Sequence, residues 1–189
     1  MVARKDFDII SEWIKPNSRI LDLGCGDGSL LKLLNEKRNV TGYGIDNSME
    51  KIIKSIDNGI NIINTNINEN LKYFSSNKFD YVVLAQSLQV VDNPVSLIKE
   101  MLRVGNEAII SFPNIGYWKS RAYLLLKGEM PVTGDLPFSW HSTPNIHLCT
   151  INDFKKMCYK NKFQIVDEVI NNNKGLNITT SSMRNLLGT

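Results

Sequence analysis

The sequence predicts a doubly wound, Rossmann-like α/β fold with a mostly parallel sheet. Short apolar segments alternate with helical patterns over the first 112 residues, which is typical of βαβ units. Several segments, such as residues 79–84, are apolar on both faces, as in strands that helices cover on both sides. The first of them, residues 20–23, leads into Gly24, Gly26 and Gly28 directly before a helical pattern. Such a turn lets the backbone approach a ligand closely and offers it free N–H groups.

Helical and strand patterns follow one another regularly in this first part of the chain. We expect Ser48 to cap one of the helices, with Ile52, Ile53 and Ile56 on its buried face. A short helical turn follows the polar residues 66–70. The predicted helices are residues 7–14, 29–36, 49–57 and 94–104, and the predicted strands are residues 20–23, 40–45, 61–64, 79–84 and 108–112.

The regular alternation ends at Pro113. A helical pattern at 117–126 is followed by a loop rich in Gly and Pro. We interpret residues 114–147 as an insertion within a single domain formed by residues 1–189. Thr150 is then expected to cap a helix that extends to about residue 160, because Asp153 completes a capping-box spacing.

The end of the chain departs from a complete sheet. Residues 163–170 predict a sixth strand, and beyond residue 171 the sequence is polar and weakly patterned. We expect the seventh strand to be short or missing, with residues 176–180 as a weak substitute. An open sheet edge has unpaired backbone N–H and C=O groups that could bind a partner chain.

Composition narrows the class of protein. The 189 residues are 42% apolar, and the net charge of +3 comes from 22 basic and 19 acidic residues without a basic stripe. The apolar runs are too short to span a membrane, and the N-terminus lacks the apolar core of a signal peptide. Three cysteines without C-x-x-C spacing suggest neither disulfides nor a zinc ribbon. We expect a cytoplasmic protein without a nucleic-acid, membrane or metal partner.

Two acidic residues indicate which ligand the glycine turn holds. Asp22 precedes the turn by two residues, where a carboxylate would oppose a pyrophosphate but suit a cationic amino-acid end. Asp46 ends the second strand, where an acid accepts hydrogen bonds from ribose hydroxyls. A nucleoside with a cationic tail and no phosphate fits both, and S-adenosylmethionine (SAM) or its product S-adenosylhomocysteine (SAH) has that form. A nicotinamide cofactor is disfavoured by Asp22 and by Ser29 at the third glycine position of the dinucleotide pattern.

The motif Leu-Asp-Leu-Gly-Cys-Gly-Asp-Gly at 21–28, with Gly-Ile-Asp at 44–46, resembles the class I SAM-dependent methyltransferases. The resemblance implies that SAM lies across the carboxyl ends of the first strands. It further implies that Asp22 faces the methionine part and Asp46 the ribose, while Asn66 stands where many members have an acid for adenine. The complete set of cofactor-binding residues that we expect is Asp22, Gly24, Cys25, Gly26, Asp46, Asn66, Ile67 and Gln86, with Cys25 as a small space-filler.

Further segments resemble a narrower family, the MetW proteins of methionine biosynthesis. These segments lie at residues 85–89, 100–105, 111–114, 128–133 and 143–150. The resemblance implies a protein that acts with homoserine O-acyltransferase as a partner or activator. The alternative is a free-standing methyltransferase that acts on a small molecule, because the glycine turn and both acids are intact.

A catalytic base is not evident from the sequence. His141 and His147, the only histidines, lie between the fifth strand and the capped helix. The resemblance to the methyltransferases implies that this insertion at 114–147 covers the acceptor side of the domain. His147 is a weak candidate for a base, with a local packing or hydrogen-bonding role as the favoured alternative. A zinc site made of His141, His147 and Cys149 is disfavoured because it supplies three ligands at most.

Overall fold

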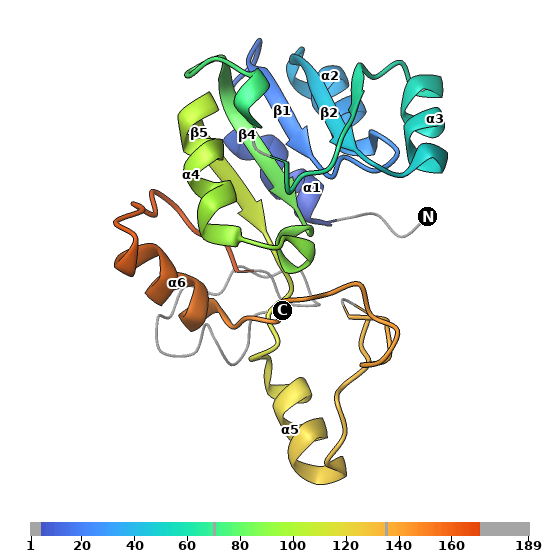
Figure 1. Ribbon diagram of the computed structural model, residues 1–189, viewed down its shortest axis with the longest axis vertical. Coiled ribbons are helices and arrows are strands. Elements are labelled where there is room, and N and C mark those ends of the chain that lie inside the picture. Colours follow the sequence, from blue (N-terminus) through green and yellow to red (C-terminus); the bar gives the residue numbers. More distant parts are fainter. Residues whose placement is uncertain (1–4, 70, 135, 171–189) are drawn as a thin grey trace. The chain divides into compact units, whose positions relative to one another are not determined.

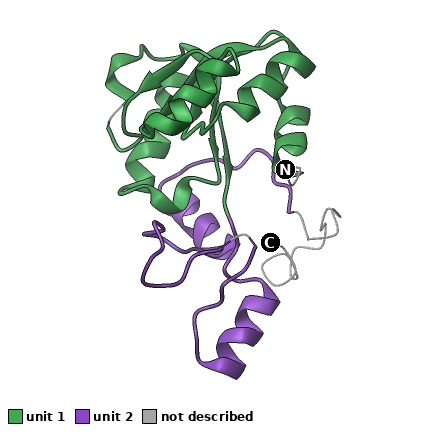
Figure 2. Ribbon diagram, turned by 90° about the vertical axis from the view of Figure 1, so that its right-hand side faces the viewer, with its two compact units in different colours: residues 1–112 green, residues 113–189 purple. Residues whose placement is uncertain are grey.

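The computed structural model describes residues 5–69, 71–134 and 136–170 (Figure 1). The chain divides into two compact units, residues 1–112 and residues 113–189 (Figure 2).

Unit 1 contains a five-stranded sheet in the order β3-β2-β1-β4-β5, with every neighbouring pair parallel. The prediction of a doubly wound parallel sheet is therefore confirmed. All carboxyl ends of the strands lie at one edge of this sheet, and β1, which leads into the glycine turn, occupies its centre. The strands are β1 (Arg19–Leu23), β2 (Thr41–Asp46), β3 (Ile62–Asn64), β4 (Phe79–Ala85) and β5 (Gly105–Ser111).

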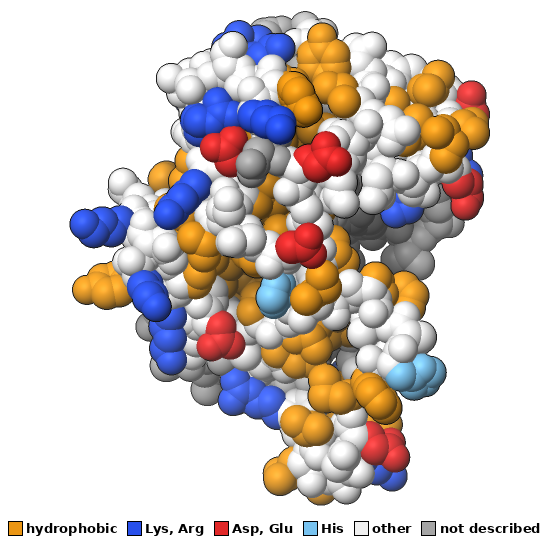
Figure 3. All heavy atoms as spheres, in the orientation of Figure 1, with side chains coloured by type: hydrophobic (Ala, Val, Ile, Leu, Met, Phe, Trp, Pro, Cys, Tyr) orange, Lys and Arg blue, Asp and Glu red, His pale blue; other side chains and the backbone are white. Residues whose placement is uncertain are grey.

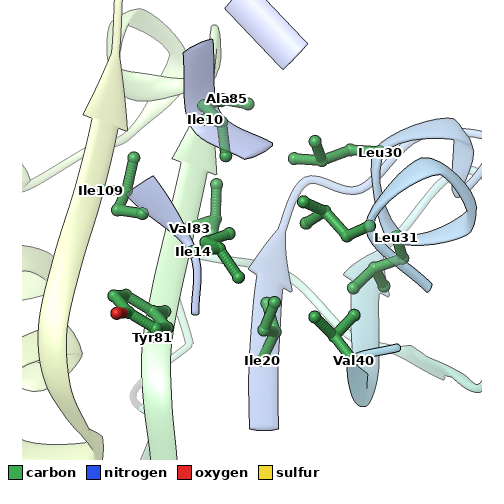
Figure 4. Packing of buried hydrophobic residues seen from close by; sticks show 11 residues of the cluster. Ile10, Ile14, Ile20, Leu30, Leu31, Val40, Tyr81, Val83, Ala85 and Ile109 are labelled. Atoms are coloured by element: carbon green, nitrogen blue, oxygen red, sulfur yellow. The ribbon is translucent and has the colours of Figure 1, made fainter. Parts of the chain in front are cut away.

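The helices of unit 1 bury the two faces of this sheet. A cluster on one face joins α1, α2 and alternate residues of the strands, including Tyr81, Val83 and Ala85 of β4 (Figure 4). Val82 of β4 points the other way, and its side chain lies against Gly105. The helical elements are α1 (Lys5–Trp13), α2 (Ser29–Arg38), α3 (Met49–Asp57), η1 (Leu71–Tyr73), η2 (Leu88–Val90) and α4 (Pro94–Val104).

The expectations about α3 hold only in part. The helix buries Ile52 and Ser55, whereas Ile53 and Ile56 are 54% and 58% exposed. The three-residue strand β3 at the sheet edge gives α3 little apolar surface to cover, so only one side of the helix is buried. Ser48 is the N-cap residue of α3, as expected, but its side chain makes no capping hydrogen bond. Its backbone N–H instead donates to Asp46 Oδ1 at 2.9 Å.

Unit 2 contains α5 (Trp118–Lys127) and α6 (Ile151–Lys160). The capping box at the start of α6 is present as expected, since Thr150 Oγ1 accepts from the N–H of Asp153 and the Asp153 side chain accepts from the N–H of Thr150. Asn114 is buried, and its Oδ1 accepts from the N–H of Gly116 at 2.9 Å and of Ile151 at 3.4 Å. Asn114 thus ties the start of unit 2 to the start of α6.

The predicted sixth strand is wrong. Residues 163–170 pair with no described strand, and Val166 within them is 80% exposed. An apolar pattern favours extended backbone, but a strand exists only where a neighbouring strand accepts its hydrogen bonds. This segment contacts α6 instead, through a 2.8 Å ion pair between Lys155 and Glu168. The weak substitute for a seventh strand at 176–180 lies outside the described residues.

Candidate functional site

The glycine turn leaves β1 in a conformation that suits glycine. Gly24, Gly26 and Gly28 have φ angles of 70°, 62° and 75°, in the left-handed region that residues with a Cβ rarely adopt. The N–H groups of Gly24 and Cys25 both donate to the carbonyl of Ile45, at 2.8 and 3.0 Å. The turn is therefore fixed to the carboxyl end of β2, the strand that ends in Asp46.

One glycine of the turn faces open space. A Cβ at Gly26 would meet no heavy atom within 4 Å, whereas a Cβ at Gly24 would lie 2.8 Å from Ser87 Oγ. A Cβ at Gly28 would clash with Ser55 and Ile60. Two of the three glycines are thus needed for packing inside the protein, and Gly26 leaves room for a ligand to approach the backbone.

Asp46 is 6% exposed and holds the turn from the end of β2. Its Oδ2 accepts from the N–H of Gly26 at 2.9 Å, and its Oδ1 accepts from the N–H of Ser48 at 2.9 Å. An ionised carboxylate has about four acceptor positions, so each oxygen can accept one more hydrogen bond. Asp46 can therefore bind hydroxyl donors while it continues to position Gly26.

Asp22 is the second buried acid, at 1% exposure in the middle of the sheet. It lies in β1 between Gly44 of β2 and Val83 of β4. A carboxylate this deeply buried needs hydrogen bonds or a cationic partner. Its position in the strand that leads into the turn suits the contact with the methionine part of SAM that we expect for it.

Cys25 fills the space beside the turn as a neutral thiol. A Cβ on Gly44 would clash with the Cys25 side chain, so the thiol fits only because residue 44 is glycine. Burial raises the pKa of the Cys25 thiol to about 12, with the carboxylates of Asp22 and Asp46 adding to the effect. A nucleophilic cysteine needs a lowered pKa, so this thiol is unsuited to covalent catalysis.

Gln86 follows β4 at the same edge of the sheet, with a φ of 56°. Its N–H donates to both the carbonyl and the Oγ of Ser111, at 3.0 and 3.1 Å, and its carbonyl accepts from Gln89 Nε2 at 2.9 Å. Ser111 is a residue that sequence reasoning missed. Its contact follows from the pairing of Ala85 with Ser111 across β4 and β5, which no local pattern reveals.

Asn66 and Ile67 lie just after β3, next to the strand that carries Asp46. Asn66 is exposed, and its Oδ1 accepts from the N–H of Asn68 at 2.9 Å. The N–H of Thr65 donates to the carbonyl of Asp46 at 3.2 Å. The sheet thus brings the loop that contains Asn66 and Ile67 to the end of β2, as the site prediction requires.

The candidate catalytic base lies in unit 2. His141 and His147 are both exposed, and the ring of His141 contacts that of Trp140 edge to face at 5.7 Å. The described residues contain no group of three or more His, Cys, Asp or Glu side chains that could hold a metal ion. A role for His147 as a base stays a prediction.

None of the helices in the described part of the chain has both the length and the apolar character that a membrane span needs.

Comparison with known proteins identifies the family of this chain. The model of the family "Methionine biosynthesis protein MetW" matches residues 4–189. The chain belongs to the MetW family. It is similar to the bifunctional methionine biosynthesis protein MetXA/MetW of Rhodopirellula baltica, with 37% identity over 87% of this chain. The chain spans only 28% of the length of that relative.

Solved structures show the fold. A SAM-dependent methyltransferase from Archaeoglobus fulgidus matches with a TM-score of 0.63 and 16% identity, covering 96% of this chain and 90% of that one. The plantazolicin methyltransferase BpumL, solved with SAH, matches with a TM-score of 0.62 and 22% identity over 85% and 65% of the two chains. This member of the MetW family therefore has the Rossmann-like fold of the SAM-dependent methyltransferases, as predicted.

Proposed function

We propose that this MetW protein binds SAM or SAH at the glycine turn and acts with homoserine O-acyltransferase as its partner or activator. The observation that carries the partner is the fusion relative, in which a chain like this one shares a polypeptide with MetXA, which we take to be the acyltransferase. A fusion keeps two proteins at high effective concentration, so it is favoured where they act together.

The residues at the turn fit the proposed cofactor. Gly26 offers open space beside the backbone, and Asp46 retains acceptor positions for ribose hydroxyls. The Asp22 carboxylate would attract the cationic amino-acid end of the cofactor, and the Asn66 side-chain amide would hydrogen-bond adenine. SAM supplies, when bound, a sulfonium-activated methyl group. The protein's own part is to bind and orient the cofactor through these groups.

Calorimetry with SAM, SAH and NAD on the purified protein tests the cofactor. We expect binding of SAM or SAH and none of NAD. Asp46→Ala should weaken SAM binding by about 1 to 3 kcal/mol, because charge-assisted hydrogen bonds to the ligand are lost and Gly26 loses its acceptor. Asp27→Ala is the matched control: its carboxylate accepts from Ser29 within the same turn, and the Kd should stay within about twofold. Equal loss in both variants would contradict the role of Asp46.

The partner is tested by co-expression with the homoserine O-acyltransferase encoded in the same genome. We expect the two proteins to co-purify and the rate of acyl transfer to change when the MetW protein is present. If the two proteins do not co-purify and the rate of acyl transfer does not change, the proposed partnership is refuted, whatever calorimetry shows for SAM.

A free-standing methyltransferase acting on a small molecule is the second candidate. The intact turn and the two buried acids, Asp22 and Asp46, favour it. Labelled SAM incubated with a metabolite extract would then yield a labelled product and SAH. Absence of both above background would count against this candidate and leave the first untouched.

A further inference from the structure

Helix α5 (Trp118–Lys127) has more exposed large apolar residues than any other helix of the described chain. Four of its large apolar residues are exposed in unbroken succession, and two of them are more than three-quarters exposed: Tyr123 41%, Leu124 48%, Leu125 85% and Leu126 80%. The helix buries only Ser120 fully. Figure 3 shows hydrophobic side chains gathered over the surface that α5 forms. Trp118 at its start, with Met130 and Val132 beyond its end, extends this apolar surface at 45%, 43% and 56% exposure.

The distribution of these residues around α5 indicates how the helix is covered. Successive helical residues are about 100° apart, so four in a row cover most of the circumference. A helix that lies on a membrane surface has one apolar face and one charged face, which this arrangement does not provide. A helix of ten residues is also far too short to span a bilayer. A helix that is apolar on several sides is instead enclosed by protein.

From this geometry we infer that α5 and the residues that follow it are the docking surface for the acyltransferase partner. The inference rests on the function proposed above, because the fusion relative places a chain of this family beside MetXA. Exposed apolar patches of this kind mark protein interfaces. Aromatic and apolar anchors such as Trp118, Leu125 and Leu126 are the residues that dominate binding energy.

The charged side chains of α5 indicate what kind of partner surface would receive the helix. The exposed polar residues of α5 include Lys119, Arg121 and Lys127, and Arg121 Nε donates to the carbonyl of Gly116 at 2.6 Å, which fixes it to the backbone. Glu129 follows the helix and accepts from the Tyr123 hydroxyl at 3.4 Å. The partner surface is therefore an apolar groove with an acidic rim, as charge complementarity at interfaces requires.

The double variant Leu125→Glu/Leu126→Glu tests this assignment. The matched control is Ile53→Glu/Ile56→Glu, which places two charges on α3, where both residues are also exposed, at 54% and 58%. With the wild-type acyltransferase, the α5 variant should raise the Kd by roughly tenfold to a hundredfold, and the α3 variant should leave it within about twofold. Both variants should retain the circular dichroism of the wild-type chain.

Hydrogen exchange on the wild-type pair provides a measurement that needs no variant. Addition of the acyltransferase should protect the amides of residues 118–127 and leave those of 49–57 unchanged. This readout decides the matter if the α5 variant fails to fold. Association without protection of 118–127 would overturn the inference.

The outcomes separate this inference from the proposed function. If the wild-type proteins associate and the α5 variant associates equally well, the inference is wrong and the proposed function stands. If the wild-type proteins do not associate at all, the proposed partnership itself is wrong, and the docking surface is wrong with it. Two other outcomes would overturn the inference. If the α5 variant changes only the mass of the MetW protein by itself, measured by light scattering, α5 contacts a second copy of the chain. If the α5 variant changes only the binding to phosphatidylserine vesicles, α5 contacts a membrane.

Discussion

Leu34 and Leu125 are the same residue type, each within a ten-residue helix, yet Leu34 of α2 is 0% exposed and Leu125 of α5 is 85% exposed. In unit 1 the apolar stripes of the helices meet a parallel sheet whose strands are apolar on both faces. In unit 2, α5 buries only Ser120 fully. The same residue type therefore belongs to a packed core in one unit and to a candidate interface in the other.

The largest expected effect tests this contrast directly. Leu34→Ala should lower the free energy of unfolding by about 2 to 5 kcal/mol, because it removes buried methyl groups and leaves a cavity. Leu125→Ala should change it by less than about 0.5 kcal/mol, as is usual for surface substitutions. Urea unfolding followed by far-UV circular dichroism reports the loss of helices in both units. Comparable losses for Leu34→Ala and Leu125→Ala would break the contrast.

An effect of intermediate size is expected from Cys25 at alkaline pH. Its pKa is raised from 9.0 to about 12 by burial and by the two neighbouring acids. Between about pH 9 and 12 the unfolded chain loses the thiol proton while the folded chain keeps it, so stability falls as pH rises. The free energy of unfolding of Cys25→Ala should fall less steeply across this window than that of the wild type. Identical slopes would show that the thiol of the folded protein is not shielded.

The smallest expected effect belongs to the local structure of unit 2. Thr150→Ala removes the side-chain acceptor of the capping box at the start of α6 and should cost about 1 kcal/mol. Hydrogen exchange should show the loss first in the amides of residues 151–154. Thr150→Ser keeps the hydroxyl and serves as the control. Equal exchange in the two variants would mean that the cap does not hold this helix.

The sequence predicted those features that depend on neighbouring residues. The order of elements in unit 1, the glycine turn and the capping box of Thr150 and Asp153 all follow from short-range patterns. Hydrophobic periodicity, left-handed turns and helix caps are decided within a few residues of chain. The family resemblance rested on similarly contiguous motifs.

The errors came from features that depend on distant residues. Ile53 and Ile56 share a helical periodicity with Ile52, but the sheet edge beside α3 covers only one side of the helix. Residues 163–170 have a strand-like pattern, but no described strand pairs with them. A periodic pattern shows that a surface is apolar, and the rest of the fold determines whether it is covered.

By itself, then, the sequence determined a parallel α/β sheet, a glycine turn flanked by Asp22 and Asp46, and membership of the MetW family. Only the tertiary structure decided that Asp46 accepts from Gly26, that Ser111 holds Gln86, and that α5 is exposed. The physical reason is distance along the chain. Hydrogen bonds across a sheet and the burial of a helix depend on residues far apart in sequence, which only the folded chain brings together.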